Sequence, residues 1–334
     1  MHTQTPSRTG SLLPTVVRLA VAAVGLAMAC ASFAQDYPNK PIRVIVPYAP
    51  GGLPDAVIRR IAPRMEKELG QSLVIDNKPG ANGVVSASAL LAAPADGYTV
   101  IFSDAAFISI TPLAMKNPPY NPARDFVPVT LAATAPNFLA LHPSVPAKNL
   151  NEFIAYVQKN PGKVTCGSSG VGTLHHLSLE AMKHSLNLDV THIPFRGSGQ
   201  SVPAMVGGQT QCTLAALPSL VGHAAVGKAN IIAIAGNRTS PLLPEAEAMF
   251  AGRQGGHDFS FLLGIVARQG TPAAVVNRLT AAVKVAVEDA ENVASLRKMG
   301  VEPAGLPSAG YASALSADAE QLARVAKLAN LQAE

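Results

Sequence analysis

The sequence predicts an α/β fold in which mostly parallel sheets are flanked by helices. Short β-rich runs alternate with helical stretches, which is the pattern of βαβ units. Two glycine-rich loops each follow a short apolar strand and open a helix. The C-terminal part has apolar residues at helical spacing and alanine-rich faces, as expected for helices that cover a sheet.

The N-terminus has the features of a secretory signal peptide. Arg8 and Arg18 precede an apolar run from Leu19 to Ala29. Ser32-Phe33-Ala34 then offers small residues at the spacing that signal peptidase recognises. The apolar run is too short to span a bilayer. We therefore expect residues 1–34 to be cleaved near Ala34 and the mature chain to be exported to the periplasm.

The chain has three cysteines, one in the predicted signal peptide and two in the mature protein. Cys30 allows a lipoprotein signal as an alternative, although Ala27 is a poor match to the leucine usual at that position. Cys166 and Cys212 remain after cleavage, in a compartment where disulfides persist. If their strands are neighbours, a disulfide would stabilise the fold by about 4 kcal/mol. Adjacent strand positions often have unsuitable geometry, so we expect two buried free thiols.

The composition argues against a nucleic-acid partner. The whole chain has a formal net charge of +5, and loss of the two arginines in the signal peptide lowers it to +3. The basic residues are scattered rather than clustered. A mildly basic surface suits anionic solutes.

The β-rich runs and helical stretches follow one another in a regular order. Pro63 falls inside the first helical stretch and is expected to kink or shorten it. The C-terminal helices are expected to pack against a sheet, because they lack the strong basic face of a membrane-binding helix. The predicted strands are Ile42 to Val46, Leu73 to Asp76, Thr99 to Phe102, Val164 to Cys166, Thr191 to Phe195, Cys212 to Ala215 and Ile231 to Ala235. The predicted helices are Ile58 to Leu69, Leu150 to Gln158, Thr173 to Leu186, Ser201 to Val206, Ala273 to Asp289, Val293 to Met299 and Tyr311 to Leu328.

Two apolar segments are expected to cross between two lobes. The first, Phe126 to His142, is interrupted by prolines, and the second, Phe259 to Ala267, has a central glycine. Two crossings imply a discontinuous first domain. We therefore expect one lobe from residues 35–133 together with 258–334, and a second lobe from residues 134–257.

The two glycine-rich loops, Pro47 to Asp55 and Cys166 to Thr173, are candidate binding loops. The first turn of a helix has unpaired N–H groups and a partial positive charge, so it can hold an anion without a dedicated cation. Ser168, Ser169 and Thr173 add hydroxyls that donate to a carboxylate or cap the helix. The alternative is that both are ordinary strand-to-helix turns of an α/β fold.

These loops belong to a longer series of motifs along the chain. They are Tyr37 to Gly52 with Asp55 and Arg59, Asn77-Lys78-Pro79-Gly80-Ala81, Pro94 to Thr99, Asp125 to Val129, Gly167 to Thr173 with His176-Leu177, and Pro194-Phe195-Arg196-Gly197. Together, over nearly the whole mature chain, they closely resemble the Bug family, the substrate-binding proteins of tripartite tricarboxylate transporters.

The resemblance implies a two-lobed type II periplasmic binding protein with two crossing strands, each lobe a mixed, mostly parallel sheet flanked by helices. A small carboxylate would lie beyond the carboxyl ends of the strands, and closure of the lobes would bury it. It also implies delivery to a membrane permease with one large and one small subunit. We expect a monomer that needs no cofactor. The ligand-binding residues it implies are Tyr48, Gly52, Leu53, Ser103, Asp104, Ser168, Ser169, Gly170, Thr173, His175, Phe195, Arg196, Gly197 and Leu217.

Three departures from the family pattern concern the ligand. Ala215 and Ala216 replace the common acidic residue and Asn before Leu-Pro-Ser, so an amino group on the ligand would lose a partner. Arg196 stands where Lys is frequent, and its planar fork can grip a carboxylate, although it could equally face solvent or the other lobe. Asp104 would repel a carboxylate unless it points away or caps a turn, and we expect that structural role.

Aromatic residues near the loops leave the ligand class open. Tyr48, Phe107 and Phe195 could form walls for a flat ligand such as terephthalate or nicotinate. Ordinary packing within the lobe is the favoured interpretation for Phe107. Aliphatic dicarboxylates and citrate-like acids are the alternatives.

Two other classes of function compete with solute capture for transport. An enzyme is disfavoured, because Gly170-Val171-Gly172 lacks the third glycine of a dinucleotide fingerprint and no Gly-x-Ser-x-Gly is present at this loop. His176 and Glu180 lie one helical turn apart, but without a third ligand at recognisable spacing a helix-surface pair is expected, not a metal site. A sensor component that docks on a receptor kinase would use the same fold and cleft, so the sequence does not separate it from a transport protein.

Overall fold

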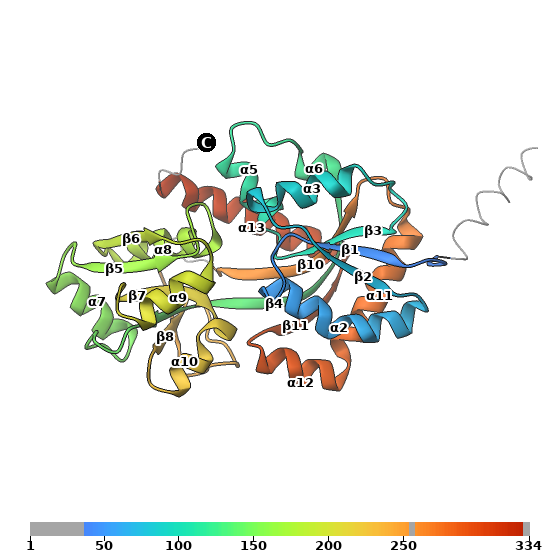
Figure 1. The fold of residues 1–334 in the computed structure, drawn as a ribbon. Coiled ribbons are helices and arrows are strands. Elements are labelled where there is room, and N and C mark those ends of the chain that lie inside the picture. Colours follow the sequence, from blue (N-terminus) through green and yellow to red (C-terminus); the bar gives the residue numbers. More distant parts are fainter. Residues whose placement is uncertain (1–36, 254–257, 330–334) are drawn as a thin grey trace, which may run out of the picture. The chain divides into compact units, whose positions relative to one another are not determined.

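The computed structural model describes residues 37–253 and 258–329 (Figure 1). The predicted signal peptide and Cys30 lie outside these residues. The chain separates into two units, Met1–Asn39 and Lys40–Glu334, and the second contains the helices and strands given below. None of the described helices combines the length and the apolar character that a membrane crossing requires.

The first group of strands contains the N-terminal βαβ units. β1 (Ile42–Val46) pairs in parallel with β2 (Leu73–Asn77) and β3 (Thr99–Ser103). β10 (Ser260–Arg268) then pairs antiparallel with β3 and with β4 (Phe126–Leu141). β-Branched side chains dominate β1 and most are buried, as expected for a strand covered on both faces. β11 (Glu302–Pro307) pairs antiparallel with β4.

The second group of strands is built on the other end of β4. There β4 pairs antiparallel with β7 (Cys212–Ala216) and β8 (Asn230–Ile234). β5 (Val164–Ser168) lies between β7 and β6 (Val190–Pro194), in parallel with both. β8 also pairs with the short β9 (Glu247–Ala248).

A single long strand therefore belongs to both groups. β4 pairs with β10 as far as Pro136 and with β7 from Asn137 onward (Figure 1). Pro128 lies at a register shift in the β10 ladder, where a proline is tolerated because the ladder is already interrupted. Both prolines of the predicted crossing segment therefore lie within one continuous strand. The proposed division near residues 133/134 and 257/258 lies close to this change of partners, and it stays a prediction.

The predicted strands and major helices are all present, and the fold class is confirmed. α2 begins earlier than expected and continues through Pro63, so this proline does not shorten the helix. The alternative, a kink at Pro63, stays a prediction. Sequence patterns missed β9, β11, α3 and several short helices. The main helices are α2 (Leu53–Leu69), α3 (Val84–Leu91), α7 (Leu150–Lys159), α8 (Leu174–Leu186), α9 (Ser198–Val206), α11 (Ala273–Glu288), α12 (Ala290–Lys298) and α13 (Ser308–Leu328). The short ones are η1 (Ala81–Gly83), α4 (Ala106–Ser109), α5 (Thr111–Ala114), α6 (Pro122–Asp125), η2 (Leu217–Ser219) and α10 (Val221–Ala225).

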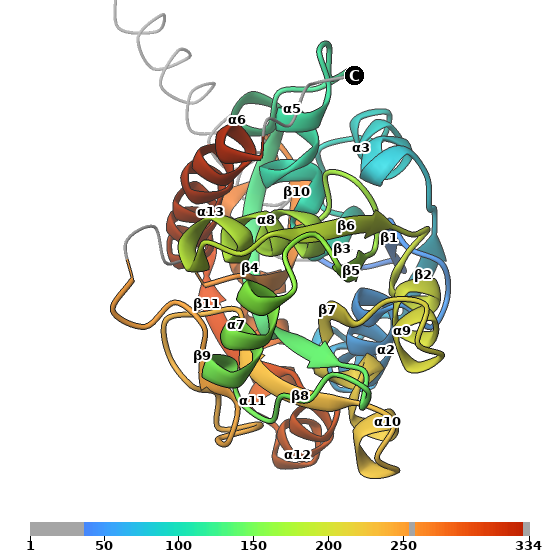
Figure 2. The same ribbon diagram turned by 90° about the vertical axis from the view of Figure 1, so that its left-hand side faces the viewer.

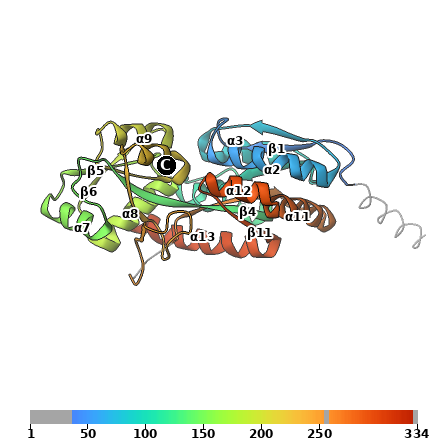
Figure 3. The same ribbon diagram turned by 90° about the horizontal axis from the view of Figure 1, so that it is seen from below.

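The C-terminal helices pack against the long strand, as predicted for this part of the chain. α11 and α13 both contact β4, and α11 also packs on α2. Figures 2 and 3 show α13 alongside β4. Tyr311, at the start of α13, is completely buried, and its ring lies close to Gly264 of β10.

Gly264 of β10 leaves no room for a side chain between β4 and the Tyr311 ring. A Cβ atom there would lie 2.5 Å from the carbonyl oxygen of Thr130 and 2.6 Å from the Tyr311 ring. Gly264→Ala is expected to lower the free energy of unfolding by about 1 to 3 kcal/mol, because the overpacked strand and ring must move apart. Urea unfolding measures the loss. Gly222→Ala is the control, since no described heavy atom lies within 4 Å of its Cβ position, and an equal effect of both changes would contradict the prediction.

Cys166 and Cys212 form a disulfide, so the expectation of two free thiols is wrong. The residues lie directly opposite each other on parallel strands β5 and β7, with their Cα atoms 4.5 Å apart. That separation is at the short end of the range that disulfides bridge. Both residues are fully buried.

Candidate functional site

A cavity of about 940 Å³ lies at the carboxyl ends of strands from both groups. Its lining comes from the loops after β1 and β3 on one side and after β5, β6 and β7 on the other. The segment Gly80 to Gly83 after β2, the start of β10 and one face of α13 also line it. Ligands of open α/β sheets bind at this end of the strands, so the cavity is the candidate site.

The loop after β1 is held in place by Asp55. Its carboxylate accepts hydrogen bonds from the Gly51 N–H at 2.9 Å, from Arg59 at 2.9 Å and from Asn77 at 2.9 Å. Burial alone would raise the pKa of Asp55, but these hydrogen bonds outweigh it and leave the pKa below its usual value. Gly51 has a φ of 84°, which favours glycine. Asp55 therefore shapes the loop, and the first turn of α2 opens on the cavity through Leu53.

The loop after β5 leads into the first turn of α8. The Thr173 hydroxyl accepts a hydrogen bond from the His176 N–H at 3.3 Å and donates one to the Gly170 carbonyl at 2.7 Å, so it caps α8. The N–H of Gly197 donates to the carbonyl of Ser169 at 3.0 Å, which ties the loop after β6 to this one. The two segments therefore face the cavity as one surface.

His175 lies at the base of this surface. Its Nδ1 is hydrogen-bonded to the Ser169 hydroxyl, and its ring contacts Phe261 edge-on at 5.3 Å between centroids. The residue is 7% exposed, and its Nε2 has no hydrogen-bond partner among the described residues. Burial lowers the pKa of His175 to about 4, so the ring is neutral at pH 7.

Asp104 closes the opposite side of the cavity. It accepts a hydrogen bond from the Tyr48 hydroxyl at 2.6 Å, and the Ala106 N–H donates to it at 3.2 Å. The carboxylate therefore holds the turn into α4, which is the structural role expected for it, while still lining the cavity. Burial raises the pKa of Asp104, although the hydrogen bonds oppose that rise. Burial, followed by the Asp104 charge, also raises the pKa of Tyr48.

Most of the predicted binding residues surround the cavity. Those that line it are Tyr48, Gly52, Leu53, Ser103, Asp104, Ser169, Thr173, His175, Arg196 and Gly197. Those outside its lining are Ser168, Gly170, Phe195 and Leu217. Contact of any of them with a ligand stays a prediction.

The four residues outside the lining have other partners. The Ser168 hydroxyl is fully buried and bonds His192 Nε2 at 2.6 Å, and the Gly170 carbonyl accepts from Thr173. The Phe195 ring packs beside Gly167, and Leu217 is buried against Gly300. Of the three predicted aromatic walls, Phe195 thus lies behind the loop. Phe107 lines the cavity, but its buried ring packs edge-on against Phe126 at 5.4 Å, in line with the favoured packing role.

Sequence reasoning missed Phe261 and Asp318, which also line the cavity. Phe261 belongs to a predicted apolar segment, and nothing local marks which of its side chains reaches the site. Asp318 has a usable signal, because it interrupts the apolar spacing of the last helix between Leu315 and Leu322.

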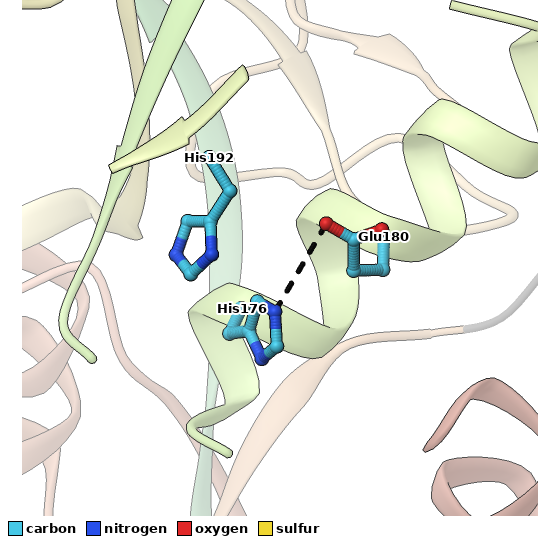
Figure 4. Close-up of side chains that lie close together, drawn as sticks. All are labelled: His176, Glu180 and His192. Carbon is cyan, nitrogen blue, oxygen red and sulfur yellow. Dashed lines mark ion pairs between the residues drawn. The ribbon is translucent and has the colours of Figure 1, made fainter. Parts of the chain in front are cut away.

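A second cluster, of His176, Glu180 and His192, lies outside the cavity lining (Figure 4). The structure adds His192 to His176 and Glu180, with one ligand atom from each lying within 4.8 Å of the others. His176 is 7% exposed, so the expectation that it belongs to a helix-surface pair is wrong.

The donor chemistry of this cluster does not suit a metal ion. His176 Nδ1 accepts the Gly172 N–H at 3.1 Å, so the proton of the neutral ring is on Nε2, the atom that faces Glu180 at 4.0 Å. The His176 and His192 rings stack at 4.3 Å between centroids with an angle of 18° between their planes. A metal must lie in the plane of each imidazole that binds it, which near-parallel stacked rings do not allow. The cluster is better explained as packing that supports the loop.

Comparisons with known proteins identify relatives that cover most of the chain. The profile of TctC, the tripartite tricarboxylate transporter family receptor, matches residues 57–331. A UPF0065 protein of Bordetella pertussis is 33% identical over 284 residues, which cover 85% of this chain and 88% of that protein. A solved structure described as a periplasmic transporter is 35% identical with a TM-score of 0.78, covering 89% of this chain and 99% of that one. Rpa4515 of R. palustris, solved with adipate, is 29% identical with a TM-score of 0.80, covering 88% and 99% respectively.

Proposed function

Because the chain belongs to the tripartite tricarboxylate transporter receptor family, we propose that it captures a small carboxylate in its cavity and delivers it to a membrane permease with one large and one small subunit. The family, identified from the sequence motifs as Bug, is confirmed. It is a family of periplasmic binding proteins rather than enzymes. Export through the N-terminal signal, with cleavage near Ala34, is part of the proposal.

The observation that carries this function is the convergence of two helix N-termini on one cavity. Leu53 of α2 and Leu174 of α8 both line it, and they come from opposite groups of strands. The N–H groups of a first helical turn have no acceptor within the helix, and the helix dipole adds partial positive charge. A carboxylate between the two termini would be held from both sides without a buried lysine or arginine.

The candidate ligands are di- and tricarboxylates, including aromatic ones such as terephthalate. Adipate in the related Rpa4515 structure supports an aliphatic dicarboxylate. Tyr48 and Phe261 offer aromatic surface in the cavity lining, which supports a flat acid. Arg196 adds a cation at the exposed side of the lining.

A thermal-shift screen of residues 35–334 tests the proposed function. The ligands are aliphatic dicarboxylates, citrate, acidic amino acids, nicotinate and terephthalate, after removal of any co-purified ligand by unfolding and refolding. A compound that binds only the folded state must raise the melting temperature. A selective rise with one class of acid is expected. No rise with any acid would contradict carboxylate capture.

Arg196→Ala is expected to weaken binding of the acid that the screen selects. Loss of a charge-assisted hydrogen bond corresponds to about 1.5 to 3 kcal/mol, or roughly tenfold to 150-fold in the dissociation constant. Isothermal titration calorimetry measures the change. Arg253→Ala, which removes an exposed arginine outside the cavity lining, is the control. Equal affinities of the Arg196 variant and the control would exclude Arg196 from the binding site.

A further inference from the structure

Asp318 occupies a position of α13 where an apolar residue is expected. Tyr311, Leu315 and Leu322 are 0%, 5% and 0% exposed, and they follow one another along the buried face of the helix. Asp318 lies between Leu315 and Leu322 on that face and lines the cavity, as Leu322 does one turn later. A charged group in such a place costs free energy unless something compensates for it, and such conflicts are typical of functional sites.

The charges around the cavity are unbalanced. Besides Tyr48, its ionisable lining residues are Asp104, Asp318, His175 and Arg196, and Arg196 is exposed. Within residues 37–253 and 258–329, Asp318 takes part in no ion pair, and Asp104 is bonded only by neutral donors. Burial raises the pKa of Asp318 to about 6. The Ser109 hydroxyl opposes this rise, and the negative charges of Asp104 and Asp258 add to it. Two carboxylates that face one cavity, with neither of them in an ion pair among the described residues, are thus at a free-energy cost in the empty protein.

A second observation points to a ligand in the same cavity. His175 lines the cavity, is more than nine-tenths buried, and leaves its Nε2 without a partner among the described residues. The Tyr311 hydroxyl, which lies outside the cavity lining, is also buried without a described partner, and its pKa is raised by burial and then by the charges of Asp104 and Asp318. Unsatisfied buried polar atoms are rare in folded proteins, and in a ligand cavity a ligand or water satisfies them.

We propose that Asp318 and Asp104 form an anionic subsite that binds an ammonium group, so that the ligand of this protein carries an amine in addition to at least one carboxylate. The inference rests on the proposed capture of a carboxylate. A second carboxylate at this end would be repelled by both residues, and a hydroxyl would leave their charges unpaired. An ammonium group pairs with them while the helix N-termini hold the carboxylate. Ala215 therefore does not exclude an amino group, because the acid comes from α13 instead.

Matched ligands test the subsite directly. Adipate, 6-aminohexanoate and hexanoate differ only in the group at one end, and succinate, 4-aminobutanoate and butanoate form the same series at shorter length. The acidic amino acids of the thermal-shift screen extend the comparison to α-amino groups. Titration calorimetry of wild-type protein at pH 7.5 is expected to show an amino compound binding about tenfold or more tightly than its dicarboxylate counterpart.

Asp318→Asn is the decisive variant, because it keeps the shape of the side chain and removes the charge. Its affinity for the amino compound is expected to fall about tenfold or more, with no loss for the dicarboxylate. Glu320→Gln removes an exposed acid from the same helix and is expected to change neither affinity. Preference of the wild-type protein for a dicarboxylate, or unchanged amine binding by the Asp318 variant, overturns the subsite alone. Absence of binding by every acid overturns the proposed function, and the subsite with it.

Discussion

Reduction of the Cys166–Cys212 disulfide is expected to lower the free energy of unfolding by about 4 kcal/mol. The two cysteines are separated by 46 residues, and this separation sets the size of the loop that the bond closes. In the chain-entropy model, opening the loop gives the unfolded chain more conformations and so favours unfolding. The bond also joins β5 to β7 directly behind the loop that carries Ser169 and Thr173. Its loss is therefore expected to loosen the second half of the candidate site.

Urea unfolding with and without a phosphine reductant measures this effect. The double variant Cys166→Ala with Cys212→Ala is the control, since its stability is expected not to respond to the reductant. Unfolding before reduction is necessary, because both cysteines are fully buried in the folded protein. Equal stability of the wild-type protein in oxidising and reducing conditions would contradict the stabilising role of the bond.

Acidification from pH 7 to pH 4 is expected to remove about 3 kcal/mol of stability through His175 alone. Burial lowers the pKa of His175 from 6.5 to about 4 in the folded protein. The unfolded chain therefore binds a proton on this residue below pH 6.5, whereas the folded protein does not until about pH 4. Stability from the neutral ring is complete above pH 6.5 and is lost as the pH falls through this window.

The pH dependence of urea unfolding, compared between two histidine variants, isolates this contribution. His175→Gln removes the titrating group and is expected to flatten the dependence between pH 6.5 and pH 4 by about 3 kcal/mol. His184→Gln removes an exposed histidine from the same helix and is expected to leave it unchanged. His176 and His192 are present in the wild-type protein and in both variants, so their contributions to the pH dependence cancel in the comparison. A His175 variant with the wild-type pH dependence would show that this residue is not the cause.

Much of the fold was predictable because its signals are local. The strands from β1 to β8 and the helices of the C-terminal part follow from periodic apolar residues, and the loop motifs identified the family. β11 was missed because Glu302 to Pro307 contains two prolines and a glycine and becomes a strand only by pairing with β4. The segment of β4 was expected as one crossing despite its prolines, but a sequence does not display the register shift that accommodates Pro128.

The sequence by itself determined the order of most strands and helices, the two glycine-rich loops and the family, since each depends on neighbouring residues or on a recognisable motif. Only the tertiary structure decided that Cys166 meets Cys212, that Ser168 and Phe195 turn away from the cavity, and that Asp318 enters it. These outcomes depend on which side chains of distant elements are brought together. Strand register and helix rotation settle that, because one step along a strand or a helix changes the face on which a side chain lies.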